Sequence, residues 1–469
     1  MQRQLSFSVR LPVSAEVAFA WHEHPSAFSR LNPPWDKTIL VSSEGVREGS
    51  RAVIGLPAPW GRLLWHAEHF NVQSGREFSD RQVSGPFRRW EHRHHFIPDG
   101  SAECVLSDNI AYELPLSPLS DLVAGWFVRY RLRRMFASRH RTLLNDLTFW
   151  KKRALLSQSQ PSRTTQMRIL VTGSAGLIGG ELVEFLKMGG HEVFGLSRSP
   201  RDPKQTIQWD LTQKRPVDAS LLQDGKPLDA VIHLAGEGIA DKRWSEDQKR
   251  ILMQSRVEAT SNLISGLAEL GLKPRVFVSA SGVGFYGDAV DAVLDESSPR
   301  GNGFLAELAE KWEQSARAAE NLLSARCVQL RLSTVLTPRG GALKKMLLPF
   351  QMGVGGRLGS GRQWMSWVAL DDVLYGIAWV LENEQVRGPV NLVSPQPVLN
   401  TEFTRILARV LRRPALLPAP AFALRLALGE MAEDLLLCSQ RAIPAALEKS
   451  GFKFSYANLE DALRHVLGK

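Results

Sequence analysis

Cysteine is scarce in this chain, and a long apolar run is missing. The three cysteines, Cys104, Cys327 and Cys438, are odd in number and far apart. This spacing argues against a disulfide framework and predicts reduced, buried thiols. No apolar stretch reaches the ~18 residues of a membrane span, and the residues after Met1 lead directly into a strand pattern rather than a signal peptide. We therefore expect a cytoplasmic protein.

Acidic residues are outnumbered by basic ones, which gives a net charge of +10. Such an excess can mark a surface for nucleic acid or anionic membranes, or the solvated face of a helix. We favour the solvated face, because aliphatic and aromatic residues lie between the arginines. The sequence therefore predicts neither a nucleic-acid nor a membrane partner, and it leaves the oligomeric state open. The basic cluster consists of Arg129, Arg131, Arg133, Arg134, Arg139 and Arg141.

The length of 469 residues and the 44% hydrophobic content predict two or three globular domains. Residues 151–166 are polar and helix-breaking towards their end, as is typical of a linker. The composition changes again near Pro414. We predict a first module over 1–150, a second over 167–413, and a small helical domain over 414–469.

The first module has the pattern of a strand, a short helix, several further strands and a long helix. Alternating apolar residues from Leu5 to Leu11 predict the first strand, and Ser14 is a candidate N-cap for the short helix. This order resembles the α+β helix-grip fold of START-like (SRPBCC) domains. The resemblance implies an apolar cavity and a carrier or sensor role for a hydrophobic ligand. The later strands are expected over 51–56, 63–72, 90–96 and 102–112.

Three histidines of the first module, His92, His94 and His95, raise the question of a metal site. Trp90, His92, His94 and Phe96 share one face of a predicted strand, so two imidazoles can converge. No carboxylate or cysteine close in sequence completes a ligand set. We expect hydrogen-bonded or solvent-facing histidines and predict no metal.

A glycine-rich turn opens the second module at Val171–Gly179, sequence VTGSAGLIG. It follows an apolar strand pattern and precedes residues with helical spacing. A strand, a glycine turn and a helix together seat the pyrophosphate of a dinucleotide, because backbone N–H groups and the helix dipole face the phosphate. The predicted pyrophosphate-binding residues are Gly173, Ser174, Gly176, Leu177, Ile178 and Gly179.

Strands are expected over 168–172, 192–197, 230–234, 275–279 and 327–332, with helices between them, for example over 245–268 and 304–323. This alternation predicts a doubly wound parallel α/β (Rossmann) sheet. The second strand ends at Ser197-Arg198, where NAD enzymes usually place an acidic residue. A guanidinium there suits a 2′-phosphate, so we predict NADP(H) in preference to NAD(H), which stays possible. The alternative is that Arg198 is a surface residue without selectivity. Asp210 is the candidate partner of the adenine amine, and the candidate backbone lining after the fourth strand is Leu234, Ala235 and Gly236.

The second module is similar to extended short-chain dehydrogenase/reductases, and within them to the atypical epimerase subfamily SDR39U1. The similarity covers 167–469, and the last segment fits the small domain that ends this subfamily. It implies an oxidoreductase or epimerase that acts on a small-molecule substrate. The matching motifs are TGSAGLIG, HLAGEGI at 233–239, RW at 243–244, SR at 255–256, SASGVGFYG at 279–287, KWE at 311–313, GGALKKMLLPF at 340–350, GGRLGSGRQWMSWV at 355–368 and DD at 371–372.

Short-chain dehydrogenases use a tyrosine and a lysine, four residues apart on a helix, as their acid–base pair. This chain lacks that pair, because none of its five tyrosines is followed by lysine at that spacing. Three interpretations stay open. Other acid–base groups act, with Ser281 and Tyr286 as candidates and Lys311 or Glu307 as helpers. The module binds NADPH without turnover, as a sensor or scaffold. Or hydride transfer proceeds with little help from protein acids and bases.

A cluster of glycines near the residues Gln363, Trp364 and Trp367 predicts a loop over the substrate, or simple turns. A lipid or hydrophobic-ligand carrier is the remaining alternative for the whole chain.

Overall fold

The computed structural model describes residues 2–158, 166–198 and 205–469. The chain divides into two compact units, unit 1 from Met1 to Thr165 and unit 2 from Gln166 to Leu467. None of the described helices is long and apolar enough to cross a membrane. The three cysteines are free thiols.

Unit 1 is built on one antiparallel sheet of seven strands. The alternating burial of β1 (Arg3–Leu11) shows why it forms: every second side chain faces the core. Two of the strands, β2 (Ile39–Ser43) and β5 (Glu77–Ser84), were not expected from the sequence. The sheet order is β1, β7 (Cys104–Glu113), β6 (Arg89–Pro98), β5 (Glu77–Ser84), β4 (Gly61–Gln73), β3 (Arg51–Ala58) and β2 (Ile39–Ser43).

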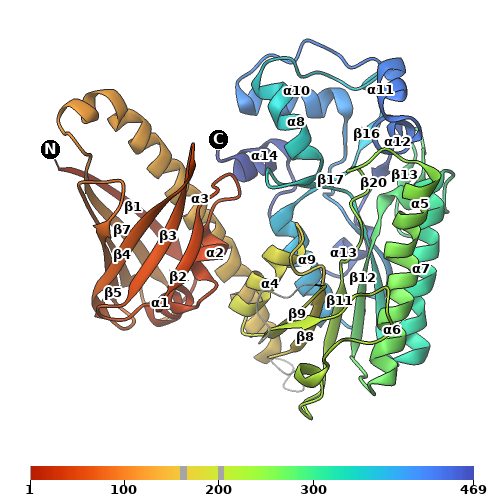
Figure 1. The fold of residues 1–469 in the computed structure, drawn as a ribbon, viewed down its shortest axis with the longest axis horizontal. Coiled ribbons are helices and arrows are strands. Elements are labelled where there is room, and N and C mark those ends of the chain that lie inside the picture. The colour runs from red at the N-terminus through yellow and green to blue at the C-terminus, as the bar shows by residue number, and fades with distance from the viewer. Residues whose placement is uncertain (1, 159–165, 199–204) are drawn as a thin grey trace. The chain divides into compact units, whose positions relative to one another are not determined.

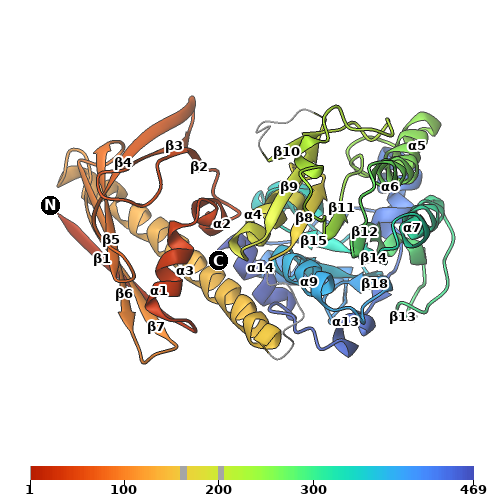
Figure 2. The ribbon, with the colours of Figure 1, turned by 90° about the horizontal axis from the view of Figure 1, so that it is seen from below.

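Three helices accompany this sheet: α1 (Ala15–Glu23), α2 (Ala27–Leu31) and the long α3 (Leu119–Gln158). Figure 2 shows α1 and α3 on the same side of the sheet. Phe136 of α3 stacks on Phe7 of β1, with ring centroids 4.9 Å apart, in a core that includes Trp90 and Tyr112. Apolar side chains from the helix and the sheet therefore bury one another.

The predicted linker began too early. Residues 151–158 continue α3, because the segment KKRALLSQ lacks a helix-breaking residue until the proline beyond it. Residues 159–165 lie outside the described residues. Of the basic cluster, Arg131, Arg133 and Arg141 are exposed on this helix, Arg129 is half-buried, and Arg131 pairs with Asp36 at 3.1 Å.

Unit 2 contains a seven-stranded sheet in which every pairing is parallel. All five residues of β8 (Arg168–Thr172) are buried, as expected for a central strand covered on both faces. From β8 the chain winds outward first on one side and then on the other, which creates a switch point in the strand order. The order is β10 (Thr206–Gln208), β9 (Glu192–Ser197), β8, β11 (Ala230–His233), β12 (Val276–Gly282), β14 (Arg326–Leu332) and β18 (Gly388–Leu392).

Helices cover both faces of this sheet (Figure 1). On one side lie α5 (Glu246–Met253), α6 (Ala259–Glu269) and α7 (Phe304–Leu322), and on the other lie α4 (Gly179–Met188) and α9 (Leu370–Glu382). The predicted helix over 245–268 is interrupted by one π turn, Gln254–Glu258.

Most of the remaining helices and short strands of unit 2 form a smaller lobe with its own apolar cluster, which includes Phe403, Trp367 and Leu463. Its helices are α8 (Gly341–Gln351), α10 (Asn400–Leu411), α11 (Ala421–Leu428), α12 (Glu430–Ala432) and α14 (Leu459–Leu467), whereas α13 (Ala445–Lys449) packs against β18 of the parallel sheet. Its paired short strands are β13 (Val293–Leu294) with β20 (Arg441–Ala442), β15 (Thr334–Leu336) with β17 (Trp367–Ala369), and β16 (Trp364–Met365) with β19 (Val398–Leu399).

Candidate functional site

The glycine-rich turn lies between β8 and α4, at the switch point of the parallel sheet. Gly173 has φ +67°, and a Cβ there would lie 2.9 Å from the backbone carbon of Leu234. A Cβ at Gly179 would overlap the carbonyl oxygen of Gly173. The tight turn is closed by a hydrogen bond from Gly176 N to Gly173 O at 2.8 Å, and Ala175 and Gly176 are exposed. The turn therefore offers open backbone at the start of a helix, which suits a pyrophosphate.

Ser197 and Arg198 follow at the end of β9, the neighbouring strand. Ser197 is half-buried and Arg198 is exposed, and neither is acidic. Asp210 stands just after β10, where its carboxylate accepts a hydrogen bond from Thr212 N at 3.0 Å. The predicted residues that follow the second and third strands are thus at the carboxyl ends of adjacent parallel strands, the edge at which such sheets bind ligands.

Leu234, Ala235 and Gly236 continue this edge after β11. The hydroxyl oxygen of Thr172 accepts hydrogen bonds from the backbone N–H groups of Leu234 and Ala235, at 3.2 and 3.1 Å. These bonds fix the segment beside the glycine-rich turn. His233 is fully buried between Thr172 and Thr260, and burial lowers its pKa to about 4, so its imidazole is neutral and structural.

Arg256 is a residue of this edge that sequence reasoning did not assign. Its side chain is buried against Gly236, donates to Glu237 O at 2.8 Å and lies over the Trp312 ring at 5.2 Å. Burial lowers its pKa to about 10, so it stays positive at neutral pH. The motif match at SR (255–256) was the available signal, but a charge on an amphipathic helix normally faces solvent.

Ser281 and Tyr286, the candidate catalytic residues, belong to one buried network. The Ser281 hydroxyl donates to Glu313 Oε1 at 2.8 Å, and Glu313 forms a two-pronged ion pair with Arg331 at 2.8 and 2.9 Å. Arg331 donates to the Tyr286 hydroxyl at 2.9 Å, and that hydroxyl donates to Asn391 Oδ1 at 2.7 Å.

This network points the two hydroxyl groups into the protein. Tyr286 is 2% exposed, and burial raises its pKa to about 12. A phenol that holds its proton this firmly is a poor general acid or base near pH 7. The catalytic assignment of Ser281 and Tyr286 stays a prediction, and their geometry favours a role in positioning the end of β12.

The helper residues and the loop residues are placed differently from expectation. Lys311 and Glu307 form an exposed i, i+4 pair at 2.6 Å, so they are surface residues. Trp367 is fully buried in the core of the small lobe and lines no loop, because its strand pairs with β15. Gln363 is buried, and its side-chain amide donates hydrogen bonds to the backbone carbonyls of Leu358 and Leu436. The ring of Trp364 packs against the guanidinium of Arg441.

A cavity of about 220 Å³ opens between the turn after β12 and the start of α7. Its walls include Gly284, Leu305 and Asn302 from the sheet side, and Asp434 and Cys438 from the small lobe. Asp434 also accepts from Leu305 N at 3.3 Å, and burial raises the pKa of its carboxyl. The cavity follows the end of β12, at the carboxyl edge of the parallel sheet, which is the edge at which such sheets bind ligands.

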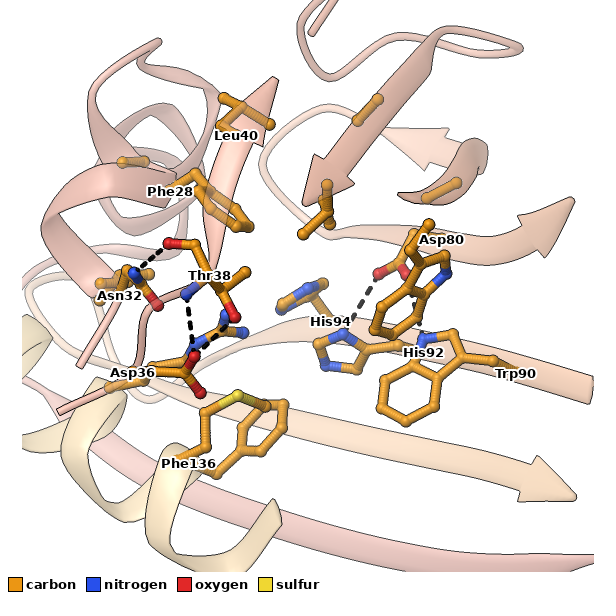
Figure 3. A pocket seen from close by; sticks show the side chains of 18 of the residues that line it. Phe28, Asn32, Asp36, Thr38, Leu40, Asp80, Trp90, His92, His94 and Phe136 are labelled. Atoms are coloured by element: carbon orange, nitrogen blue, oxygen red, sulfur yellow. Dashed lines mark hydrogen bonds and ion pairs between the residues drawn. The ribbon is translucent and has the colours of Figure 1, made fainter. Parts of the chain in front are cut away.

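Unit 1 contains a larger cavity of about 440 Å³ between the sheet and the helices (Figure 3). Its lining is mostly apolar and aromatic, and it includes Phe28, Leu40, Trp90 and Phe136. One stretch of its wall is polar. There Asp80 lies between His92 Nδ1 and Trp90 Nε1, at 3.2 Å from each.

The histidines of this wall are therefore partnered by carboxylates that sequence reasoning missed. Asp108 contacts His92, His94 and His140 at 3.2, 2.6 and 2.5 Å. Burial opposes protonation of His92, but Asp108 and Asp80 raise its pKa to about 9. Burial, with the charge of His92, lowers the pKa of His94 to about 3, so that imidazole is neutral. His95, on the other strand face, pairs with Glu77 at 2.9 Å.

Comparison with known proteins assigns unit 2. Residues 169–392 match the family described as NAD dependent epimerase/dehydratase, and residues 419–466 match a domain of unknown function, DUF1731. An epimerase family protein of Mycobacterium bovis is 40% identical over 298 residues, which is 64% of this chain and 97% of that protein. The chain belongs to the NAD dependent epimerase/dehydratase family, as an SDR39U1-like member.

Other family members extend this similarity. Human epimerase family protein SDR39U1 is 35% identical over 64% of this chain and 100% of its own length. Its crystal structure, determined with NADPH, covers 64% of this chain and 99% of that chain at a TM-score of 0.58. A nucleoside-diphosphate sugar epimerase from Corynebacterium glutamicum is 31% identical and covers 99% of this chain and 90% of that one, at a TM-score of 0.78. That structure therefore includes a counterpart of unit 1.

Proposed function

We propose that unit 2 binds NADP(H) and acts as an oxidoreductase or epimerase on a small molecule. The observation that carries the proposal is the turn between β8 and α4. Substituents on Gly173 or Gly179 would collide with backbone, and the N-terminus of α4 is open beside exposed Gly176. The NADPH in the structure of human SDR39U1 supports the choice of cofactor. The bound nicotinamide would supply or accept hydride.

The residues of this chain have distinct parts in the proposal. Backbone N–H groups of the turn hold the pyrophosphate, and Asp210 stands where the adenine amine would lie. Leu234 and Ala235, fixed by Thr172, line the cofactor with backbone. Ser281 and Tyr286 enter as positioning residues, because both hydroxyls are bonded inside the protein.

Arg198 provides the test of cofactor choice. Its exposed guanidinium at the end of β9 is free to meet a 2′-phosphate, and a charge-assisted hydrogen bond contributes about 1.5 kcal/mol, roughly tenfold in affinity. Arg198→Ala should weaken NADPH binding about tenfold and leave NADH binding unchanged, as measured by calorimetric titration. Arg317→Ala, an exposed arginine of α7, is the control. Equal loss for both cofactors, or none, refutes the 2′-phosphate contact.

A second candidate function is NADPH binding without turnover. It is favoured by the buried, bonded hydroxyl of Tyr286 and by the absence of a tyrosine–lysine pair. The two candidates separate when nicotinamide absorbance is followed with a panel of carbonyl compounds and nucleotide sugars. Tight NADPH binding with no turnover on any of them would favour a sensor or scaffold.

For unit 1 we propose a START-like helix-grip domain that holds a hydrophobic ligand. The cavity of about 440 Å³ and its apolar lining support this proposal. Ala52→Phe places a ring in the cavity, whereas Val53→Phe on the same strand points to the other face. Mass spectrometry of organic extracts of purified protein should show less retained ligand for the first variant only. Equal retention by both variants would refute the cavity as the binding place.

A further inference from the structure

Strand register brings four ionisable side chains to one place on the cavity wall of unit 1. Asp80 of β5 is the direct cross-strand partner of His92 in β6, and His94 is the partner of Asp108 in β7. His92 and His94 are two residues apart and face the same side of the sheet. Direct partners have Cβ atoms about 4.5–5.5 Å apart. The backbone pairing alone therefore collects two imidazoles and two carboxylates.

Three of these residues have the geometry of a metal-binding set. The donor atoms of Asp80, His92 and His94 all lie within 4.8 Å of one another, and His92 Nδ1 is 3.2 Å from Asp80 Oδ2. Imidazole nitrogen with carboxylate oxygen is a donor set that suits zinc and the neighbouring divalent transition metals. Three protein ligands leave a coordination position open, and here it would face the cavity.

Asp108 supplies the outer support that such a site needs. Its Oδ1 is 3.2 Å from His92 Nε2 and 2.6 Å from His94 Nδ1, so one ring nitrogen of each histidine faces it. The other nitrogen of His92, Nδ1, faces Asp80 Oδ2 at 3.2 Å, and the metal would lie between these two donor atoms. His140 holds Asp108 Oδ2 from behind at 2.5 Å. A carboxylate behind a ligating imidazole fixes its tautomer and raises its basicity.

The surrounding charge also suits a cation. Two carboxylates, Asp80 and Asp108, face the histidines, and the guanidinium of Arg139 lies near enough to interact with both of them. His22 approaches His94 with a ring-centroid distance of 5.8 Å, but its Nδ1 is taken by Ala18 O at 2.7 Å.

We propose that Asp80, His92 and His94 bind a divalent transition-metal ion, zinc or a close neighbour of zinc, at the cavity wall of unit 1. Asp108 orients the two imidazoles. The open coordination position holds water, or the oxygen donor of a molecule that enters the cavity. The cavity of unit 1 would then bind its ligand through a metal ion as well as through apolar contacts.

The test is a metal titration of the full-length, tag-free protein after treatment with a chelator. Co²⁺ is the probe, because its visible absorption reports its coordination, and Zn²⁺ is the competitor. We expect one Co²⁺ per chain with the spectrum of a site of four or five donors. Asp108→Asn should weaken the affinity about 10–100-fold, and Asp80→Asn and His94→Gln should weaken it further.

His95→Gln is the matched control, because His95 lies on the same strand but faces outward and is 36% exposed. It should bind Co²⁺ like the parent protein. Near- and far-ultraviolet circular dichroism verifies that each variant is folded. Absence of stoichiometric Co²⁺ binding by the folded parent, or unchanged binding by folded His94→Gln, overturns the proposal and leaves a network of ion pairs only.

Discussion

Glu313 joins the candidate catalytic residues to the core, so its replacement tests the network directly. Its side chain is 2% exposed and that of Arg331 is 3% exposed. In Glu313→Gln the guanidinium stays buried with one acceptor oxygen in place of a charged pair. Breaking a buried pair by removal of one partner costs about 3–5 kcal/mol. Because glutamine keeps one oxygen for Arg331 or Ser281, we expect about 3 kcal/mol of lost unfolding free energy.

Differential scanning calorimetry of the full chain measures this loss. The transition of unit 2 is identified by its upward shift with NADPH, since a ligand stabilises the state that binds it. Glu310→Gln on the same helix is the control. Its carboxylate is 38% exposed and pairs with Arg300 at 3.2 Å, so its loss should cost under about 1 kcal/mol. If Glu313→Gln changes stability as little as the control does, the buried pair does not hold β12 and β14 in place.

Two further predictions concern pH and backbone. Burial raises the pKa of Asp372 to about 7, against about 4 in an unfolded chain, so the folded state keeps a proton that the unfolded state loses between these values. The stability from this carboxyl is therefore present at low pH and is lost as the pH rises to 7. In urea unfolding, the free energy of unfolding of Asp372→Asn should rise relative to that of the parent by about 2–3 kcal/mol between pH 5 and pH 8. A difference between the two proteins that does not change with pH would contradict the raised pKa. In Gly179→Ala the new Cβ would overlap Gly173 O, so this variant should lose NADPH binding and about 1–3 kcal/mol of unit 2 stability, as measured by thermal shift with and without NADPH. The control is Gly180→Ala, whose Cβ would have its nearest atom at 3.7 Å, and it should bind NADPH normally in that assay.

The parallel sheet could be read closely from the sequence. The predicted strands at 168–172 and 192–197 have the observed bounds of β8 and β9. Central strands of such a sheet are buried on both faces, so they stand out as short apolar runs between glycine turns. The glycine-rich turn could also be predicted from the sequence, because glycines at this spacing allow a tight turn and a close approach of backbone to phosphate.

Only part of the antiparallel sheet of unit 1 could be predicted from the sequence. The burial pattern of β2 is almost wholly exposed, and β5 carries the polar sequence EFSDRQVS, so neither strand shows a usable hydrophobic alternation. The carboxylates beside the histidines were missed for a related reason. Asp80 and Asp108 are far from His92 in sequence, and only the register of β5, β6 and β7 brings them to it.

At the candidate catalytic site, the orientation of the side chains could not be predicted from the sequence. Ser281 and Tyr286 were chosen for their place after β12, and the structure brings both into one network. Which way a hydroxyl points depends on Glu313 and Arg331, whose pairing is set by the packing of α7 against β14. Sequence spacing contains no information about that orientation.

The order of strands in unit 1 also constrains how the chain is made. β1 leaves the ribosome before the other strands of its sheet, but its sheet partner is β7, which ends at Glu113 and is followed by α3. During synthesis the apolar face of β1, with Phe7 and Val9, has no native cover until almost the whole unit has been translated. A nascent chain stalled before Cys104 would present an unpaired strand edge and should depend on chaperones, whereas a permuted chain in which β1 follows β7 would close the sheet through a local connection.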